Sequence, residues 1–524
     1  MRSDSSLHTG DFNECIRRSL EAEDYAVRHF GSDHVQQVYI NLMLGEAYTR
    51  VGLLDLAYSC LQKALGILKL STASKEYGMY VSICYNDLGY VCRLMGKHGE
   101  SLENYKSALG CKKETHGEDH PSLVSSLNNI GIAYEAQNKL TEALECFQKA
   151  LVLSRGHFGE DAQITATTYS NIGNIYLLQG RFDIALKYYG KAREILEAIS
   201  SIENPDLATL YNNIGSALKE LDLLDEALSM HSQALILREA TLGTMHPDVA
   251  SCFMQLGEVY LAKDVVDKAR DCFSRAREIR ESVLGSGHVD TGATLLALGN
   301  ACVQSMNYDE ALKYYDLAAS CLRSASASLE ELTHVDSCIA YVFMVQGRPS
   351  AAMKVYTRLL KQCERRNGEN HPATATLYNN VANVLRQQGQ LPESLRLYEK
   401  ALVVYEDVYG ANHRCTATAY VNLGNVFLSL HQHADALHAY LQAKAIRERL
   451  YGTYHVDTAA CYSNLALVFA DQKLHDQAFG MLETAKNILE TVYGPTHEET
   501  LYVKKTISRL LRERRQIQHR HVTR

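Results

Sequence analysis

Apolar and polar positions repeat along most of this chain with a period of about 42 residues. Residues 169–192 read YSNIGNIYLLQGRFDIALKYYGKA, and residues 420–443 read YVNLGNVFLSLHQHADALHAYLQA. Within one unit the apolar residues follow helical spacing twice, in LYNNIGSALKEL (210–221) and in DEALSMHSQALILREATL (225–242), with a short polar turn between them. Each unit is therefore predicted to be a helical hairpin.

A small residue marks the same point in each unit. Successive members of this series lie 41 to 44 residues apart. A period of that length is typical of a solenoid built from stacked hairpins. The series is Gly45, Gly89, Gly131, Gly173, Gly215, Gly257, Gly299, Ala340, Ala382, Gly424 and Ala466.

Two further small positions recur in the second half of each unit. Ala or Ser stands twelve residues after each aligned residue, from Ala57 to Ala478. Seven positions later comes Ala in ten of the eleven units, with Leu359 as the exception. Small side chains allow two helices to approach closely, which a stacked array of hairpins requires.

Most units close with Gly-x-x-His, as in Gly410 and His413. The Gly suits a helix C-cap, and a Pro after the His, as at positions 121, 247 and 372, suits the first turn of the next helix. Consecutive His residues of this motif lie one whole unit apart, so no two are expected to share a metal ion. His431, His433 and His438 form the one local His cluster, which we expect to be a solvated turn without a nearby carboxylate or Cys.

The ends and one internal stretch depart from the regular repeat. Residues 11–30 resemble the second helix of an incomplete unit, so we divide the chain into an N-terminal segment (1–36), the repeats (37–497) and a basic C-terminal helix and tail (498–524). The stretch 318–335 has a shortened step and lacks Gly-x-x-His; it is either a bend or an inconsequential shorter loop. The C-terminal helix is expected to cap the array, the alternatives being docking to an acidic partner or to an anionic surface.

Composition and charge narrow the possible functions. The chain has 524 residues, 46% of them hydrophobic and only seven of them Pro, so we expect it to be folded throughout. Its fourteen Cys residues form no C-x-x-C pair and no signal peptide is evident, which favours an intracellular protein with reduced thiols. No apolar window is long enough for membrane insertion. The net charge of −8 argues against nucleic acid as a partner, although residues 498–524 carry eight basic and three acidic residues.

These patterns resemble the tetratricopeptide repeat (TPR) family, in which Gly or Ala precedes a large residue and Ala follows twelve and nineteen positions later. The 42-residue step and the GTMHPDVA segment (243–250) are similar to the long-repeat subclass of kinesin light chains and nephrocystin-3-like proteins. The resemblance implies an all-α, right-handed superhelical solenoid of about eleven hairpins with a C-terminal capping helix. Kinesin light chains carry heptads before their repeats; this sequence shows no such segment, and this departure leaves direct motor binding an open question.

The resemblance also implies that the first helix of each unit lines a concave, peptide-binding groove. Positions six and two before the aligned residue, and one and five after it, share one stripe of that helix. Asn is frequent on this stripe, and its carboxamide can pair with the main chain of an extended peptide. The residues that we expect in the groove are Asn129, Asn171, Asn174, Asn213, Lys219, Gln255, Asn300, Asn380, Asn383, Arg386, Asn422, Asn425 and Asn464.

Two questions about this stripe stay open. The Asn side chains can instead bond a neighbouring repeat or simply occupy a crowded solvent-facing position. The stripe is also less polar in units six to eight, at Gln255, Ala297 and Cys338, so we hypothesise two recognition segments, about 120–230 and 370–475, separated by a spacer. Glu135, Glu220 and Glu258 join Lys219 and Arg386 as candidates for specificity.

The sequence carries no nucleotide-binding loop, nucleophile elbow or HExxH motif. We therefore expect a non-catalytic scaffold or adaptor that binds protein or peptide partners without a cofactor or metal. The resemblance implies a cytoplasmic location and a cytoskeletal, motor-cargo or ciliary setting. The alternatives are a structural subunit embedded in a larger assembly and a regulatory repeat segment that partners a signalling enzyme.

Overall fold

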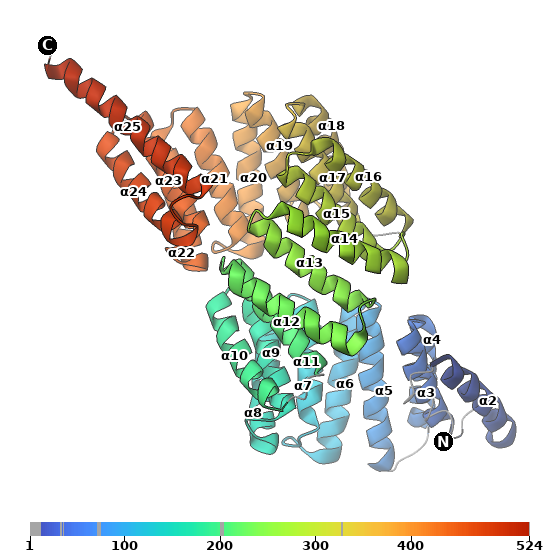
Figure 1. Ribbon diagram of the computed structural model, residues 1–524. Helices are drawn as coiled ribbons and strands as arrows, with labels where there is room; N and C mark the ends of the chain where they lie inside the picture. Colours follow the sequence, from blue (N-terminus) through green and yellow to red (C-terminus); the bar gives the residue numbers. More distant parts are fainter. Residues whose placement is uncertain are drawn as a thin grey trace. The chain divides into compact units, whose positions relative to one another are not determined.

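The computed structural model describes residues 12–31, 34, 36–70, 75–199, 204–325 and 329–522. In these ranges all the regular secondary structure is α-helical, in 24 helices labelled α2 to α25 (Figure 1). From α3 to α24 they form eleven successive pairs, and each pair contains one residue of the aligned small series. The prediction of an all-α repeat of eleven helical hairpins is confirmed.

The chain divides into two compact units, residues 1–217 and 218–524. In each unit a helix packs against its hairpin partner and against the next hairpin along the chain, as a solenoid requires. The helices of the first unit are α2 (Phe12–Phe30), α3 (Gln36–Val51), α4 (Leu54–Leu70), α5 (Lys75–Leu94), α6 (His98–His116), α7 (Leu123–Ala136), α8 (Leu140–Phe158), α9 (Gln163–Leu178) and α10 (Phe182–Ile199), with α11 (Pro205–Glu220) crossing the division.

The second unit holds the remaining helices. They are α12 (Leu224–Leu242), α13 (Pro247–Ala262), α14 (Val266–Val283), α15 (Val289–Gln304), α16 (Tyr308–Ser324), α17 (Leu329–Val345), α18 (Pro349–Asn367), α19 (Pro372–Gln387), α20 (Leu391–Tyr409), α21 (Arg414–Ser429), α22 (His433–Tyr451), α23 (Val456–Asp471), α24 (His475–Val492) and α25 (Glu498–Val522). The predicted irregularity at 318–335 falls on α16, α17 and their connection, of which residues 326–328 lie outside the described part.

Helices at the two ends cover the outermost hairpins. α2 packs against α3 and buries Cys15 in a cluster with Met43 and Ala47. At the other end α25 packs against α24, with Val503 and Ile507 in the cluster that the last hairpin forms. Both helices therefore keep apolar surface of the terminal hairpins away from water.

The small residues of the second helices are fully buried. The Ala or Ser twelve positions after each aligned residue is 0% exposed in all eleven hairpins. Where Ser replaces Ala, its hydroxyl bonds the carbonyl of the aligned residue: Ser101 Oγ donates to Gly89 at 2.7 Å, and Ser394 Oγ to Ala382 at 2.8 Å. The recurring Ala or Ser therefore marks the point where the two helices of each hairpin pack closely.

A buried side chain sixteen positions after the aligned residue rests against it. A Cβ atom built on Gly173 would lie 2.5 Å from the ring of Tyr189, and one built on Gly424 would lie 2.6 Å from the ring of Tyr440. Real Cβ atoms essentially never come so close, so Gly lets the ring pack directly on the helix backbone. These aromatic residues are among the largest fully buried side chains of the protein.

Residues with positive φ occur both in the turn inside each hairpin and in the loop that joins one hairpin to the next. Inside each hairpin the turn residue seven positions after the aligned residue has positive φ; it is Gly in five hairpins and residues such as Asn138 and His431 in the others. After the second helix a Gly such as Gly410, with φ 84° and ψ 170°, ends the helix. That conformation is open essentially only to Gly.

The Gly-x-x-His motif continues this cap into the next helix. His413 Nδ1 accepts a hydrogen bond from the Cys415 N–H at 3.2 Å, and Thr416 Oγ1 donates to the Gly410 carbonyl at 3.1 Å. Capping by the motif His is repeated at His246, His288, His371 and His455. Pro247 and Pro372 begin their helices as predicted, whereas Pro121 precedes α7, which begins at Leu123.

Replacing Gly410 by Ala is expected to destabilise the second unit by about 1–3 kcal/mol, because Ala disfavours this backbone conformation. No atom lies within 4 Å of the added Cβ, so the effect isolates backbone strain. The matched control is Gly480→Ala, in the exposed middle of α24 with equally open surroundings, which should stabilise by about 0.5–1 kcal/mol. Urea unfolding followed by circular dichroism measures both, and equal effects at the two positions would contradict this account of the cap.

Candidate functional site

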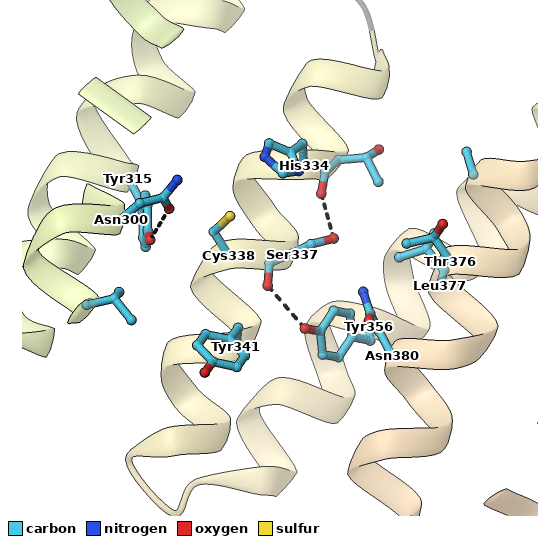
Figure 2. A pocket seen from close by; sticks show the side chains of 13 residues that line it. Asn300, Tyr315, His334, Ser337, Cys338, Tyr341, Tyr356, Thr376, Leu377 and Asn380 are labelled. Atoms are coloured by element: carbon cyan, nitrogen blue, oxygen red, sulfur yellow. Dashed lines mark hydrogen bonds between the residues drawn. The ribbon is translucent and has the colours of Figure 1, made fainter. Parts of the chain in front are cut away.

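A pocket of about 460 Å³ opens between the first helices of three successive hairpins in the second unit (Figure 2). Asn300 reaches it from α15, Cys338 and Tyr341 come from α17, and Leu377 and Asn380 come from α19. Its size lies in the range of sites that accept small ligands or single side chains. Its position on the predicted groove stripe makes it the candidate site.

The lining follows the stripe that helical geometry predicts for the first helices. His334 and Thr376 stand six positions before the aligned residue, Cys338 and Asn380 two before, and Tyr341 one after. Of the predicted groove residues, the structure brings Asn300 and Asn380 together in this pocket. Asn383 and Arg386 also lie on α19 but do not line the pocket, and the others lie on other first helices.

Hydrogen bonds fix the polar groups at the base of the pocket. The buried Tyr315 hydroxyl donates to Asn300 Oδ1 at 2.7 Å, and the buried Tyr356 hydroxyl donates to the Ser337 carbonyl at 3.1 Å. Figure 2 shows both bonds, together with that of the Ser337 hydroxyl to Thr333. Asn380 makes no side-chain hydrogen bond within the described part of the chain, so its carboxamide is available to a ligand.

Cys338 contributes a neutral thiol to the pocket lining and does not act as a nucleophile. Burial raises the pKa of its thiol to about 11, because desolvation disfavours the thiolate. At neutral pH the side chain therefore behaves as a small apolar group. With the exposed ring of Tyr341 and with Leu377 it makes the pocket mainly hydrophobic.

Most of this pocket lies in the stretch that the sequence pattern marks as a spacer, and its α19 side belongs to the predicted second recognition segment. Units seven and eight lack the polar residue two positions before the aligned one, having Ala297 and Cys338 there instead. The absence of the amide is part of what makes the site apolar. The sequence could not distinguish an apolar pocket lining from core packing, because small apolar residues on a helix are typical of both.

Three Asn residues of the predicted stripe bond to the preceding repeat. The Nδ2 of Asn129 donates to Asn86 at 2.9 Å, that of Asn213 to Asn174 at 3.0 Å, and that of Asn422 to Asn379 at 2.7 Å. These bonds join neighbouring first helices, as in the alternative role considered for Asn. Each carboxamide still has a carbonyl oxygen that can accept another hydrogen bond.

A second set of Asn residues, one position after the aligned residue, supports the core. Asn174, Asn383 and Asn425 accept hydrogen bonds from the hydroxyls of Tyr189, Tyr398 and Tyr440 at 2.6 to 2.7 Å, as Asn300 does from Tyr315. A buried hydroxyl needs such a partner. The pairing has a signal in the sequence that was overlooked: Tyr follows each of these Asn residues by fifteen positions.

The remaining predicted groove residues differ in their surroundings. Lys219 forms an ion pair with Glu258 at 2.6 Å, and Arg386 is exposed. The Nδ2 atom of Asn171 is buried without a hydrogen-bond partner in the described residues. Gln255 and Asn464 are partly buried and make no side-chain hydrogen bond in this part of the chain.

The His cluster of the α21–α22 turn differs from its prediction. His431 and His433 both contact Asp471, the last residue of α23, so the expected absence of a nearby carboxylate is wrong. The sequence did not reveal it because Asp471 belongs to the next repeat, 38 residues after His433. His438 instead contacts Gln442 and stands outside this group.

Two further features of the described chain are its lack of a membrane-spanning helix and the state of its Cys residues. No helix there is both long enough and apolar enough to span a bilayer. All fourteen Cys residues are free thiols.

Comparison with known proteins identifies the repeat. The tetratricopeptide repeat model matches residues 80–155, 137–198, 206–265, 253–324, 331–402, 373–449 and 416–491, which together span most of the chain. No curated protein matches significantly.

Several solved structures are similar in part. BtubC (BKLC) from P. vanneervenii is 24% identical, with a TM-score of 0.39 over 44% of this chain and 92% of that one. A putative kinesin light chain from Podosopora anserina with nearly identical TPR-like repeats is 18% identical, with a TM-score of 0.33 over 38% and 94%. The apo form of RapI is 14% identical, with a TM-score of 0.49 over 71% and 98%.

Repeats of this kind typically serve as non-catalytic scaffolds for binding proteins or peptides. The matched repeats extend over more than half of the sequence, and the hairpins of the structure coincide with them. The chain belongs to the tetratricopeptide repeat family.

Proposed function

We propose that this protein is a non-catalytic adaptor that binds an extended segment of a partner protein along its first helices, with one apolar side chain of the segment in the α15–α17–α19 pocket. The observation that carries the proposal is the coincidence of an apolar pocket with the predicted binding stripe. Buried apolar contacts supply affinity, and amides at the rim supply orientation.

The walls of the pocket suggest what enters it. Tyr341, with 54% of its surface exposed, presents an aromatic face, and the neutral Cys338 thiol provides apolar surface beside the buried Leu377. Such a surface favours Leu, Met or an aromatic side chain over a charged one. His334 and Thr376, both exposed at the rim, offer polar contacts to the flanking main chain.

The Asn residues extend recognition beyond the pocket. Asn380 has an unengaged carboxamide at the pocket, and Asn464 has one at the equivalent position two hairpins later. Amide groups can pair with peptide N–H and C=O groups irrespective of the peptide's side chains. The stretch between the two predicted recognition segments is then not a spacer under this proposal. It contributes most of the pocket that anchors the bound peptide.

The proposed cellular setting rests on the resemblance to the long-repeat subclass of kinesin light chains. We propose a cytoplasmic location, with cytoskeletal, motor-cargo or ciliary partners. Proximity labelling with the tagged full-length protein in cells would test this part separately from the pocket.

The binding test uses peptides rather than an assumed partner. A library of random 12-residue to 16-residue peptides displayed on phage is selected on the full chain, and enriched peptides are measured by fluorescence anisotropy. We expect enriched peptides to share one apolar anchor. Tyr341→Ala and Asn380→Ala should each weaken binding by about tenfold, the loss expected for one buried contact or hydrogen bond.

Asn487→Ala is the control for Asn380→Ala, because Asn487 is exposed on the second helix α24 and lies outside the predicted binding stripe. Replacing the apolar anchor of a selected peptide by Asp should abolish its binding to the wild-type protein. Unchanged affinity in both pocket variants, with unchanged helicity, would remove the pocket from the function.

A further inference from the structure

Two departures from the repeat pattern occur together in the tenth hairpin. The turn position seven after the aligned residue is Gly, Asn or Asp in most hairpins, and the position two further on is usually apolar. Only the tenth hairpin has His at both, as His431 and His433. In the next hairpin, the position five after the aligned residue is Asp471.

The fold brings these three side chains to one point. His433 Nε2 lies 2.6 Å from Asp471 Oδ2, and His431 Nδ1 lies 3.1 Å from the same oxygen. All three ligand atoms lie within 4.8 Å of one another. His431 occupies the left-handed turn residue (φ 57°), His433 begins α22 and Asp471 ends α23, so helix termini position all three side chains.

A contact at the equivalent positions of an earlier hairpin pair shows what is unusual about the group of His431, His433 and Asp471. Between the sixth and seventh hairpins, Gln304 Nε2 donates to Asp264 Oδ1 at 2.8 Å, and these residues occupy the repeat positions of Asp471 and His431. That contact pairs one amide donor with one acceptor. At the later site two imidazoles converge on one carboxylate oxygen, which places two nitrogen ligands and one oxygen ligand together.

The group is open to solvent and combines ligand types that suit a cation. Asp471 supplies a carboxylate oxygen, and each His supplies one ring nitrogen. His431 has 76% of its side chain exposed, His433 26% and Asp471 39%, which leaves a path for an ion from solvent. No other group of three His, Cys, Asp or Glu residues in the described ranges meets the same distance criterion.

We propose that His431, His433 and Asp471 form a binding site for a divalent transition-metal ion, best suited to Zn²⁺. Zn²⁺ takes imidazole nitrogens and carboxylate oxygens at about 2.0–2.2 Å in tetrahedral geometry, which requires ligand atoms roughly 3.3 Å apart. The observed separations bracket that spacing: 2.6 Å and 3.1 Å from the two His nitrogens to Asp471 Oδ2, and at most 4.8 Å between any two ligand atoms. A solvent water would complete the tetrahedron, whereas Mg²⁺ and Ca²⁺ prefer sites made of oxygen ligands only.

A bound ion would join two successive repeats. The His ligands belong to the α21–α22 turn and Asp471 belongs to α23, so the ion would hold the last two hairpins together at their turn edge. Because a ligand that binds only the folded state stabilises it, Zn²⁺ should slow local opening of these hairpins. This inference is independent of the proposed peptide pocket in α15, α17 and α19.

The test is isothermal titration of the full chain with Zn²⁺ alone. The wild type should bind one more equivalent, or bind it at least about tenfold more tightly, than His433→Ala or Asp471→Ala, since even the loss of an outer-shell partner costs 10-fold to 100-fold in affinity. His438→Ala, an exposed His on α22 outside the group, should bind like the wild type. His431→Ala is a second ligand variant at a more exposed position, in case His433→Ala folds poorly.

Two structural readouts distinguish this site from adventitious binding to thiols. X-ray absorption of the one-equivalent complex should show only nitrogen and oxygen neighbours near 2.0–2.1 Å, whereas Cys ligation would add sulfur near 2.3 Å. Hydrogen exchange should show slower opening of α21 to α24 with Zn²⁺ in the wild type and not in the ligand variants. Identical isotherms for wild type and all ligand variants, or a sulfur shell, would overturn the proposal.

Discussion

Replacing Tyr440 by Ala is expected to lower the free energy of unfolding of the C-terminal hairpins by about 3–5 kcal/mol. The side chain is 0% exposed, packs on Gly424 and belongs to the apolar cluster formed by Ala436, Leu465 and Val468. Truncation removes the buried ring and leaves a cavity between two hairpins. It also removes the hydroxyl that bonds Asn425 at 2.7 Å.

The measurement has to resolve local stability, because a repeat array can unfold in part. Urea denaturation gives the overall loss, and hydrogen exchange with mass spectrometry shows whether opening is concentrated in α21 to α24. Tyr454→Ala is the control: this Tyr is 69% exposed, and its replacement should change stability by less than about 0.5 kcal/mol. Similar losses for the two variants would contradict the packing described for Tyr440.

The protein is expected to lose stability in mild acid through His231. This residue of α12 is 0% exposed and holds the core position that is Tyr, Phe or Leu in the other hairpins. Burial, assisted by the charge of Lys219, lowers its pKa from the usual 6.5 to about 4. The folded protein therefore keeps His231 neutral at pH values where the unfolded chain is protonated.

The direction of the pH dependence follows from this difference. Between pH 6.5 and about 4 the unfolded state binds the additional proton, so acidification favours unfolding. The contribution of His231 is fully present above pH 6.5 and falls by up to about 1.4 kcal/mol per pH unit, or on the order of 3 kcal/mol in all. His231→Phe, which places an aromatic ring at the position as in other hairpins, should remove this part of the pH dependence.

The comparison requires unfolding curves of both proteins from pH 4 to 7. Burial also lowers the pKa of His413 and His455, so the wild type retains other acid-sensitive groups and only the difference between wild type and variant isolates His231. His438→Ala, at an exposed position, should leave the slope unchanged. If His231→Phe and the wild type lose stability in parallel, the assigned role of His231 is wrong.

Repeat comparison within one chain supplied much of the structural prediction. The Ala and Ser positions identify the closest contacts between helices, and all of them prove fully buried. Gly410 and His413 illustrate why local motifs were predictable: positive φ and an N-cap depend on a few consecutive residues. Contacts between residues about 40 positions apart could not be predicted from the sequence pattern, as the Asn129–Asn86 and His433–Asp471 contacts show.

The candidate site was predicted only in part. Helical geometry placed Asn300, Cys338 and Asn380 on one stripe, and all three line the pocket. The pattern did not indicate that a pocket forms where the Asn series is interrupted. Pocket formation depends on the spacing of α15, α17 and α19, which is set by packing over three hairpins.

The sequence by itself determined the helix pairs, their number, the turn and cap residues and the face that each first helix presents, because these follow from periodicity and short-range backbone preferences. Only the tertiary structure decided what each polar side chain of that face contacts. The Asn425 carboxamide supports a buried Tyr, the Asn422 carboxamide joins two repeats, and the Asn380 carboxamide remains available beside a pocket. Identical side chains took different roles because hydrogen-bond partners and cavities arise from the packing of neighbouring repeats.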